Sequence, residues 1–229
     1  MNYKMKTIAV AAMSLAFAGT ALAQADVSFY GRANVSVESQ KLGEKSETAL
    51  VDNASRFGIK ANHALPNGMS AGLVLEAGTN LTNGATKTEG LTTLTNAQNA
   101  VTSVSGGGSR LFAREATVAL NGGFGQVKLG RLAASAAYFA TADFVSNHNH
   151  DTGSSADALY DFIATGALKN AVSYATPKMG NLQLEAQYGF KYGTGVDGTD
   201  ERKINPMALS ANYVTGPLAL GMGYERGDN

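Results

Sequence analysis

The sequence predicts an all-β fold, specifically a transmembrane antiparallel β-barrel. Three observations support this prediction. Apolar and polar residues alternate with a period of two along many segments, which is typical of strands with two unlike faces. Short turns and long connections follow one another in regular order along the chain. The chain also opens with a segment that is typical of exported proteins.

Residues 1–25 predict a signal peptide that is removed on export. Lys4 and Lys6 precede an apolar run, and Ala23-Gln24-Ala25 fits the small-residue cleavage rule. The apolar run is shorter than the ~20 residues of a membrane-spanning helix. Without this leader, 16 basic residues face 18 acidic ones. No concentrated basic patch results, so we expect no nucleic-acid partner.

The first strand is expected from Val27 to Val37. Small or apolar residues occupy its odd positions, and polar residues such as Arg32 and Asn34 occupy its even positions. At ~3.3 Å per residue this strand is roughly 36 Å long. Tilted near 45°, it would cover ~25 Å along the membrane normal, the height of the apolar band of a barrel. Most strands of soluble proteins are shorter, about 5–6 residues. One strand alone does not tell whether its apolar face meets a dry core or lipid.

Eight further segments predict strands by the same alternation, which gives about nine strands in all. The alternation is clearest in 182–190 and weakest in 110–120 and 125–131. The eight segments are approximately 57–65, 69–77, 110–120, 125–131, 169–175, 182–190, 207–213 and 218–225.

The connections between these strands decide which face looks inward. Short connections with turn-forming residues stand at 66–68, 121–124, 177–181 and 214–217. Long connections alternate with them at 39–54, 78–109, 132–168 and 192–203. Short turns on one side and long loops on the other are a feature of outer-membrane barrels. We therefore expect the polar face to line a wet interior and the apolar face to meet lipid.

Four segments resemble the general porins of Gram-negative outer membranes, and most closely the neisserial and beta-proteobacterial type. The segments are Asp26-Val27-Ser28-Phe29-Tyr30-Gly31, "SRFGIKANHALPNGMSAGLVLEAG", "ATVALNGGFGQVKLGRL" and "NAVSYATPKMGNLQLEAQYGF". The resemblance covers essentially everything after the leader. It implies a homotrimer of barrels of about sixteen strands, each with a water-filled channel. The sequence stops just past the ninth strand, so we expect residues 26–229 to be the N-terminal part of a longer barrel; a truncated, non-functional product is the alternative.

The resemblance also implies where the channel is narrowest. The third long loop, 132–168, folds into the barrel in such porins, whereas the loop at 78–109 reaches over a neighbouring subunit. The narrowing loop contributes four acidic candidates, Asp143, Asp151, Asp157 and Asp161. The wall contributes four basic candidates, Arg32, Lys60, Arg114 and Arg131. Arg32 and Lys60 also lie on the polar faces of their strands, whereas Arg114 and Arg131 rest mainly on the resemblance. Facing acidic and basic rows would set a transverse field across the gap.

Three functions were weighed against these observations. The first is passive diffusion of ions and small hydrophilic solutes, and the second is a structural or adhesive barrel that does not conduct. The third, a membrane-embedded hydrolase, is disfavoured because His63, His148 and His150 have no evident Ser/Asp partners. The mainly small, polar or charged inward residues favour the channel. We expect no enzyme activity, no cofactor and no metal site, and we expect outer-membrane lipids and lipopolysaccharide as surroundings.

Overall fold

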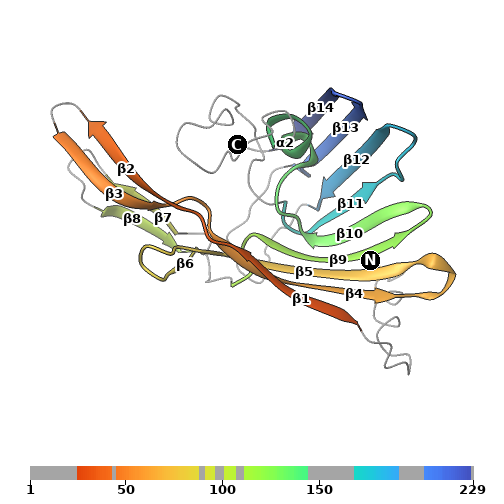
Figure 1. The fold of residues 1–229 in the computed structure, drawn as a ribbon, viewed down its shortest axis with the longest axis horizontal. Coiled ribbons are helices and arrows are strands. Elements are labelled where there is room, and N and C mark those ends of the chain that lie inside the picture. The colour runs from red at the N-terminus through yellow and green to blue at the C-terminus, as the bar shows by residue number, and fades with distance from the viewer. Residues whose placement is uncertain are drawn as a thin grey trace, which may run out of the picture.

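A computed structural model describes residues 25–42, 45–87, 91–95, 101–106, 111–143, 168–190 and 204–227 of the chain. Most of the described chain forms one large antiparallel sheet that curves around a short helical segment (Figure 1). Nine strands follow one another across this sheet in chain order, with β1 and β14 at its two edges. They are β1 (Asp26–Arg32), β4 (Arg56–Ala64), β5 (Ser70–Thr79), β9 (Glu115–Gly122), β10 (Gly125–Arg131), β11 (Ala171–Ala175), β12 (Leu182–Gly189), β13 (Met207–Thr215) and β14 (Leu218–Arg226). The all-β class and the antiparallel strands predicted from the sequence are confirmed.

Tight turns join the strand pairs at one end of the sheet. β4 leads into β5 through the short turn η2 (Pro66–Gly68), where Asn67 has a φ of 61° and Gly68 a φ of 71°. The other three turns, at 123–124, 176–181 and 216–217, join β9 to β10, β11 to β12 and β13 to β14. Turns that need positive φ favour Gly and Asn, and this is why the sequence located all four.

The predicted first strand is wrong at its far end, because β1 stops at Arg32 and a new strand begins at Val35. Asn34 leaves the ladder because it bonds to the segment before β4. Its backbone N–H donates to Ser55 Oγ at 3.0 Å, and its side-chain amide donates to the Asn53 carbonyl at 3.0 Å. Side-chain bonds of this kind compete with regular strand pairing.

Two of the long connections contain strands that the sequence did not predict. The connection after β1 forms a hairpin of β2 (Val35–Leu42) and β3 (Lys45–Asp52). The connection after β5 contains β6 (Thr86–Lys87), which pairs with β5, and a hairpin of β7 (Leu91–Thr95) and β8 (Val101–Gly106). Both hairpins extend away from the main sheet at the end opposite the tight turns (Figure 1).

The two faces of the main sheet are chemically opposite. Large apolar side chains stand exposed on one face, led by Phe29 at 81% and Met222 at 70% exposure. The buried apolar residues are mostly alanines, and one of their clusters joins Ala136 and Ala137 to Ala208 of β13. A soluble sheet would bury its large apolar residues. The exposed apolar face is the arrangement of a transmembrane β-strand.

A short helical segment follows β10 and lies on the concave side of the sheet. It consists of α2 (Ala136–Tyr138) and one wider turn, η3 (Phe139–Asp143). Figure 1 shows α2 inside the curve formed by β10 to β14. We call the face that α2 contacts the inner face.

Candidate functional site

Strand register determines which side chains share the inner face. Gln187 of β12 touches α2 and therefore belongs to this face, because its side-chain carbonyl accepts the Ala136 N–H at 2.8 Å. Its cross-strand partner is Ser173, whose partner on β10 is Lys128. Continuing across β9, β5, β4 and β1, the same row contains Ala119, Gly72, Asn62 and Asp26. The polar sets that the sequence assigned to the interior thus share one face.

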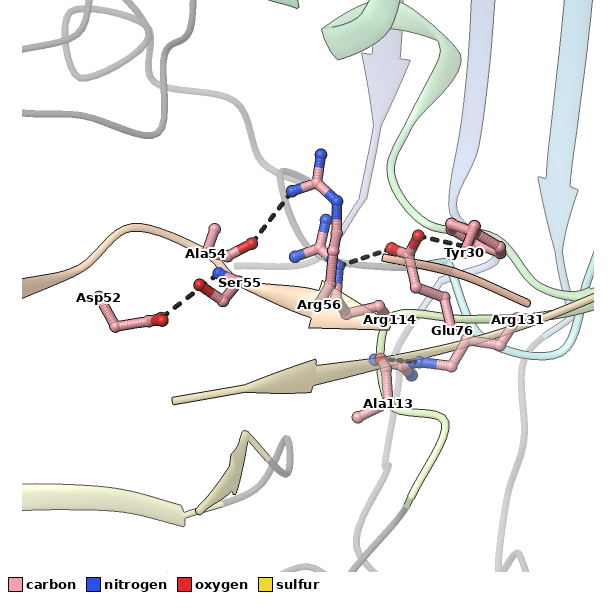
Figure 2. A network of polar contacts seen from close by, with 9 residues as sticks. All are labelled: Tyr30, Asp52, Ala54, Ser55, Arg56, Glu76, Ala113, Arg114 and Arg131. Atoms are coloured by element: carbon pink, nitrogen blue, oxygen red, sulfur yellow. Dashed lines mark hydrogen bonds and ion pairs between the residues drawn. The ribbon is translucent and has the colours of Figure 1, made fainter. Parts of the chain in front are cut away.

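A basic cluster lies on this face at the end nearest the long connections. Arg32 of β1 and Arg56 of β4 are direct cross-strand partners. Arg114, just before β9, is joined to Glu76 of β5 through its Nε, 2.7 Å from Glu76 Oε1. Figure 2 shows the side chains of Arg56 and Arg114 side by side, both rising from the strand layer on the same side as the Glu76 carboxylate. Arg114 therefore pairs with the Glu76 carboxylate, and Arg32 and Arg56 occupy neighbouring positions at the same end of the inner face.

Glu76 is held from two sides and is only 8% exposed. The Tyr30 hydroxyl donates to Glu76 Oε2 at 2.9 Å, while Arg114 occupies Oε1 (Figure 2). A buried carboxylate needs such partners, because an unpaired buried charge is strongly unfavourable. Glu76 therefore orients Arg114 and connects β1, β5 and the start of β9.

Tyr30 reaches Glu76 by crossing over a glycine. Its ring lies above Gly58, its cross-strand partner, where an added Cβ would come within 2.6 Å of the ring. An aromatic ring that covers a glycine on the neighbouring strand pins the register of that pair. Lys60 Nζ lies 4.3 Å from the centroid of the same ring, within the range of a cation–π interaction.

The opposite part of the inner face holds the start of the 132–168 loop. Ser135 donates from Oγ to Glu225 of β14 at 2.6 Å and also accepts the N–H of Tyr138 as the helix cap. Asn212 of β13 donates to the Ala140 carbonyl at 3.5 Å. Below the helix, a Cβ added to Gly223 would come within 2.7 Å of the Ala137 Cα. Small residues on both sides let the backbone of the loop approach the wall closely.

Of the four predicted wall residues, Arg32, Lys60 and Arg114 lie on the inner face, whereas Arg131 does not. Arg32 and Arg114 lie in the basic cluster, and Lys60 lies two inward positions beyond Arg56 on β4, closer to the tight turns. Arg131 pairs with Ala116 on the opposite face, is 9% exposed and donates from Nε to the Ala113 carbonyl. Figure 2 shows its guanidinium beside Ala113 and apart from those of Arg56 and Arg114. Gly130, with a φ of 130°, interrupts the regular alternation just before it.

The four predicted acidic residues of the loop belong mostly to an undescribed part of the chain. Asp143 ends η3, and its side chain lies outside the described residues. Asp151, Asp157 and Asp161 also lie outside the described residues, as do residues 1–24 of the predicted signal peptide and the two histidines His148 and His150. Their roles remain predictions from the sequence.

Sequence reasoning assigned no role to the residues that organise the site. Arg56, Glu76 and Tyr30 stand at polar positions of the alternation, but nothing local marks them as neighbours. Gln187 and Glu225 hold the loop, and the sequence assigned no role to them either. The only available signal was their inward position, because their contacts join residues 46, 38, 51 and 90 positions apart in the chain.

Among the described residues, no three His, Cys, Asp or Glu side chains come close enough together to hold a metal ion. No helix in the described part of the chain has the length and apolarity needed to cross a membrane.

The described sheet is antiparallel, with an apolar outer face, a polar inner face and a loop folded back onto that inner face. These features define the wall of a transmembrane β-barrel. The chain belongs to the family of Gram-negative porins, whose family model matches residues 9–229. The match does not separate types within the family, so the neisserial and beta-proteobacterial type stays a prediction. A comparison with curated proteins found no match.

Two solved structures share this fold. An anion-selective porin from Comamonas acidovorans is 22% identical with a TM-score of 0.60, covering 89% of this chain and 58% of that one. OmpF of Salmonella typhi, in a complex with daunomycin, is 16% identical with a TM-score of 0.56, covering 87% of this chain and 53% of that one. At these identities the similarity shows the fold alone. The chain spans a little over half the length of these two relatives.

Proposed function

We propose that this protein forms a water-filled channel in the outer membrane, through which ions and small hydrophilic solutes diffuse passively. The observation that carries the proposal is the loop after β10, which packs on a polar inner face while large apolar side chains stand on the other face. A polar wall that a loop only partly covers suits water rather than a packed core.

The channel would be narrowed between the loop and the basic cluster. Arg32, Arg56 and Arg114 supply positive charge on one wall. The loop 132–168 supplies the acidic residues Asp143, Asp151, Asp157 and Asp161. Charges of opposite sign across an aqueous gap set up a transverse field, which orients polar solutes and biases the choice of ions. Permeation of this kind involves no bond breaking, so we assign no catalytic residue and no cofactor.

We further propose that residues 1–25 are a cleaved signal peptide and that the channel works as a homotrimer surrounded by outer-membrane lipids and lipopolysaccharide. The leader pattern supports export. The family membership and the exposed apolar outer face support the membrane location. The trimer rests on the resemblance of the sequence to general porins.

A planar lipid bilayer tests the proposed function. The porin would be purified, folded, from the outer membrane of its source and added to one side of the bilayer. We expect the current to rise in discrete steps as single assemblies insert. Folded assemblies that insert without any conductance would overturn the channel and favour the structural or adhesive barrel.

A further inference from the structure

A hollow of about 330 Å³ lies on the inner wall, on the tight-turn side of the basic cluster, and its lining combines apolar surface with charged and amide side chains. Its floor is formed by the neighbouring strands β5 and β9, through Gly72, Val74, Thr117 and Ala119. Its rim is formed by side chains from β1, β4 and β10 and by polar residues further along β9. The hollow faces the same interior as the basic cluster and adjoins it at Glu115, the cross-strand partner of Glu76.

The floor is open because Gly72 has no side chain. Nothing in its backbone requires glycine, because it has no positive φ. An added Cβ would make only ordinary contacts, with the Ala119 Cβ at 3.6 Å and with the Ala61 carbonyl oxygen and Asn121 Nδ2 at 3.9 Å. Glycine weakens the interior of a strand, so its presence here has a cost without a conformational reason. The evident effect of Gly72 is therefore to leave the centre of the floor empty.

Two ammonium groups stand on opposite sides of this floor. Lys60 rises from β4 and Lys128 from β10, and β5 and β9 lie between them. Three strand spacings separate their backbones by roughly 14 Å, a gap that two lysine side chains can partly bridge. Within the described part of the chain Lys128 makes no ion pair, and the Lys60 ammonium meets only the face of the Tyr30 ring. Both charges are available to a solute.

Carboxylates and amides complete the rim. Glu115 accepts a hydrogen bond from Thr117 Oγ1 at 2.8 Å, which orients its carboxylate and leaves acceptor positions open. Asp26 lies at the β1 edge of the hollow. Gln126 donates to Asn121 at 2.6 Å, while Asn62 adds an amide that both donates and accepts. Two positive and two negative charges therefore surround one open floor.

We propose that this hollow binds small zwitterionic solutes, such as amino acids and short peptides, during their passage through the channel. The inference deepens the proposed function and rests on it. The solute carboxylate lies between Lys60 and Lys128, and the solute ammonium lies toward Glu115. A simple anion would meet the rim carboxylates, and a simple cation would meet the two lysines, so the mixed rim favours a molecule that carries both signs.

The test measures solute binding as a concentration-dependent, saturable reduction of single-channel current. The probes are glycylglycine as the zwitterion, N-acetylglycine as the anion and ethanolamine as the cation, each near neutral pH. We expect saturable reduction with glycylglycine and much weaker reduction with the other two. Equal or stronger reduction by N-acetylglycine would overturn the zwitterion class in favour of an anion site. A porin without any conductance would instead contradict the proposed channel itself.

Variants locate the binding. Gly72→Leu fills the floor and should abolish saturation by glycylglycine while conductance persists. Ala219→Leu adds the same side chain to the inner face of β14, away from the hollow, and should leave glycylglycine binding unchanged. Lys128→Gln should weaken binding about two- to fivefold, as expected for loss of one exposed charge contact. If Gly72→Leu does not fold, the test depends on Lys128→Gln. Unchanged glycylglycine binding in Lys128→Gln would then overturn the proposal.

Discussion

The two halves of the inner wall differ in what their side chains position. On β1, β4, β5 and β9 the wall carries charges of both signs, and these charges are organised by contacts between side chains that stand on neighbouring strands. On β12, β13 and β14 the wall is covered by α2 and η3, and small residues bring backbone close to backbone. The first half shows how a porin wall positions charge, and the second shows how it positions a loop. Each half has a glycine at a key position. Gly223 lets the loop approach the wall under α2, whereas Gly72 leaves the floor of the hollow empty.

The largest effect is expected where the loop contacts the wall. Gly223→Leu places a side chain where even a Cβ would lie 2.7 Å from the Ala137 Cα, and such overpacking costs about 1–3 kcal/mol. We expect α2 to be pushed toward the channel, which lowers single-channel conductance and increases gating noise. Gly72→Leu is the matched change in the other half. Its Cβ would make only ordinary contacts and lies away from α2, so this variant should leave the loop in place. Equal gating noise in both variants would contradict the inference that only Gly223 makes room for the loop.

The next effect concerns the charge that the loop carries. Replacing Asp143 and Asp157 together with Asn removes two negative charges from the loop 132–168, which we propose to narrow the channel. We expect the permeability ratio, measured as the zero-current potential under a salt gradient, to shift toward anions. The shift should shrink at high salt because screening weakens charge effects across an aqueous gap. An unchanged ratio at low salt would mean that the narrowest part of the channel lies elsewhere.

A smaller, two-part effect is expected in the basic half. Glu76→Gln removes the charge that partners Arg114, so selectivity should shift toward anions. Tyr30→Phe leaves every charge in place and should keep selectivity. Its cost in stability should be about 1.5 kcal/mol, because it removes one hydrogen bond to a carboxylate. Unfolding in guanidinium, followed by circular dichroism, measures that cost.

Tyr213→Phe on the exposed outer face is the matched control for Tyr30→Phe, and its stability should be unchanged. If Tyr30→Phe shifted selectivity as much as Glu76→Gln, the hydroxyl would act on permeation directly. Glu76 would then not be the residue that organises the cluster.

The smallest effect is expected from Ser135→Ala. This variant loses the contact with Glu225 and the helix cap on Tyr138, together about 1 kcal/mol of local stability. We expect more frequent brief closures of the open channel with unchanged mean conductance. Ser46→Ala on the β2–β3 hairpin removes a similar hydroxyl far from the loop and should leave the closures unchanged. Identical records from the two variants would contradict a holding role for Ser135.

The sequence predicted strands well where local geometry alone decides them. The bounds of β10 were predicted as 125–131 and are Gly125–Arg131 in the structure, and β4 and β5 were predicted within two residues at each end. The first strand failed at Asn34 because its partners, Asn53 and Ser55, come later in the chain. Arg131 could not be placed because Gly130 breaks the period of two on which the prediction depended.

By itself the sequence determined the strand class, the tight turns and the division of residues between a polar and an apolar face. These follow from the pleat of a single strand and from the positive φ of turn residues, both of which are local. Only the tertiary structure decided that Tyr30 and Arg114 share Glu76, and that Gln187 and Glu225 hold the loop. Those contacts depend on register and on the curvature of the whole sheet, which bring residues far apart in the chain onto neighbouring positions.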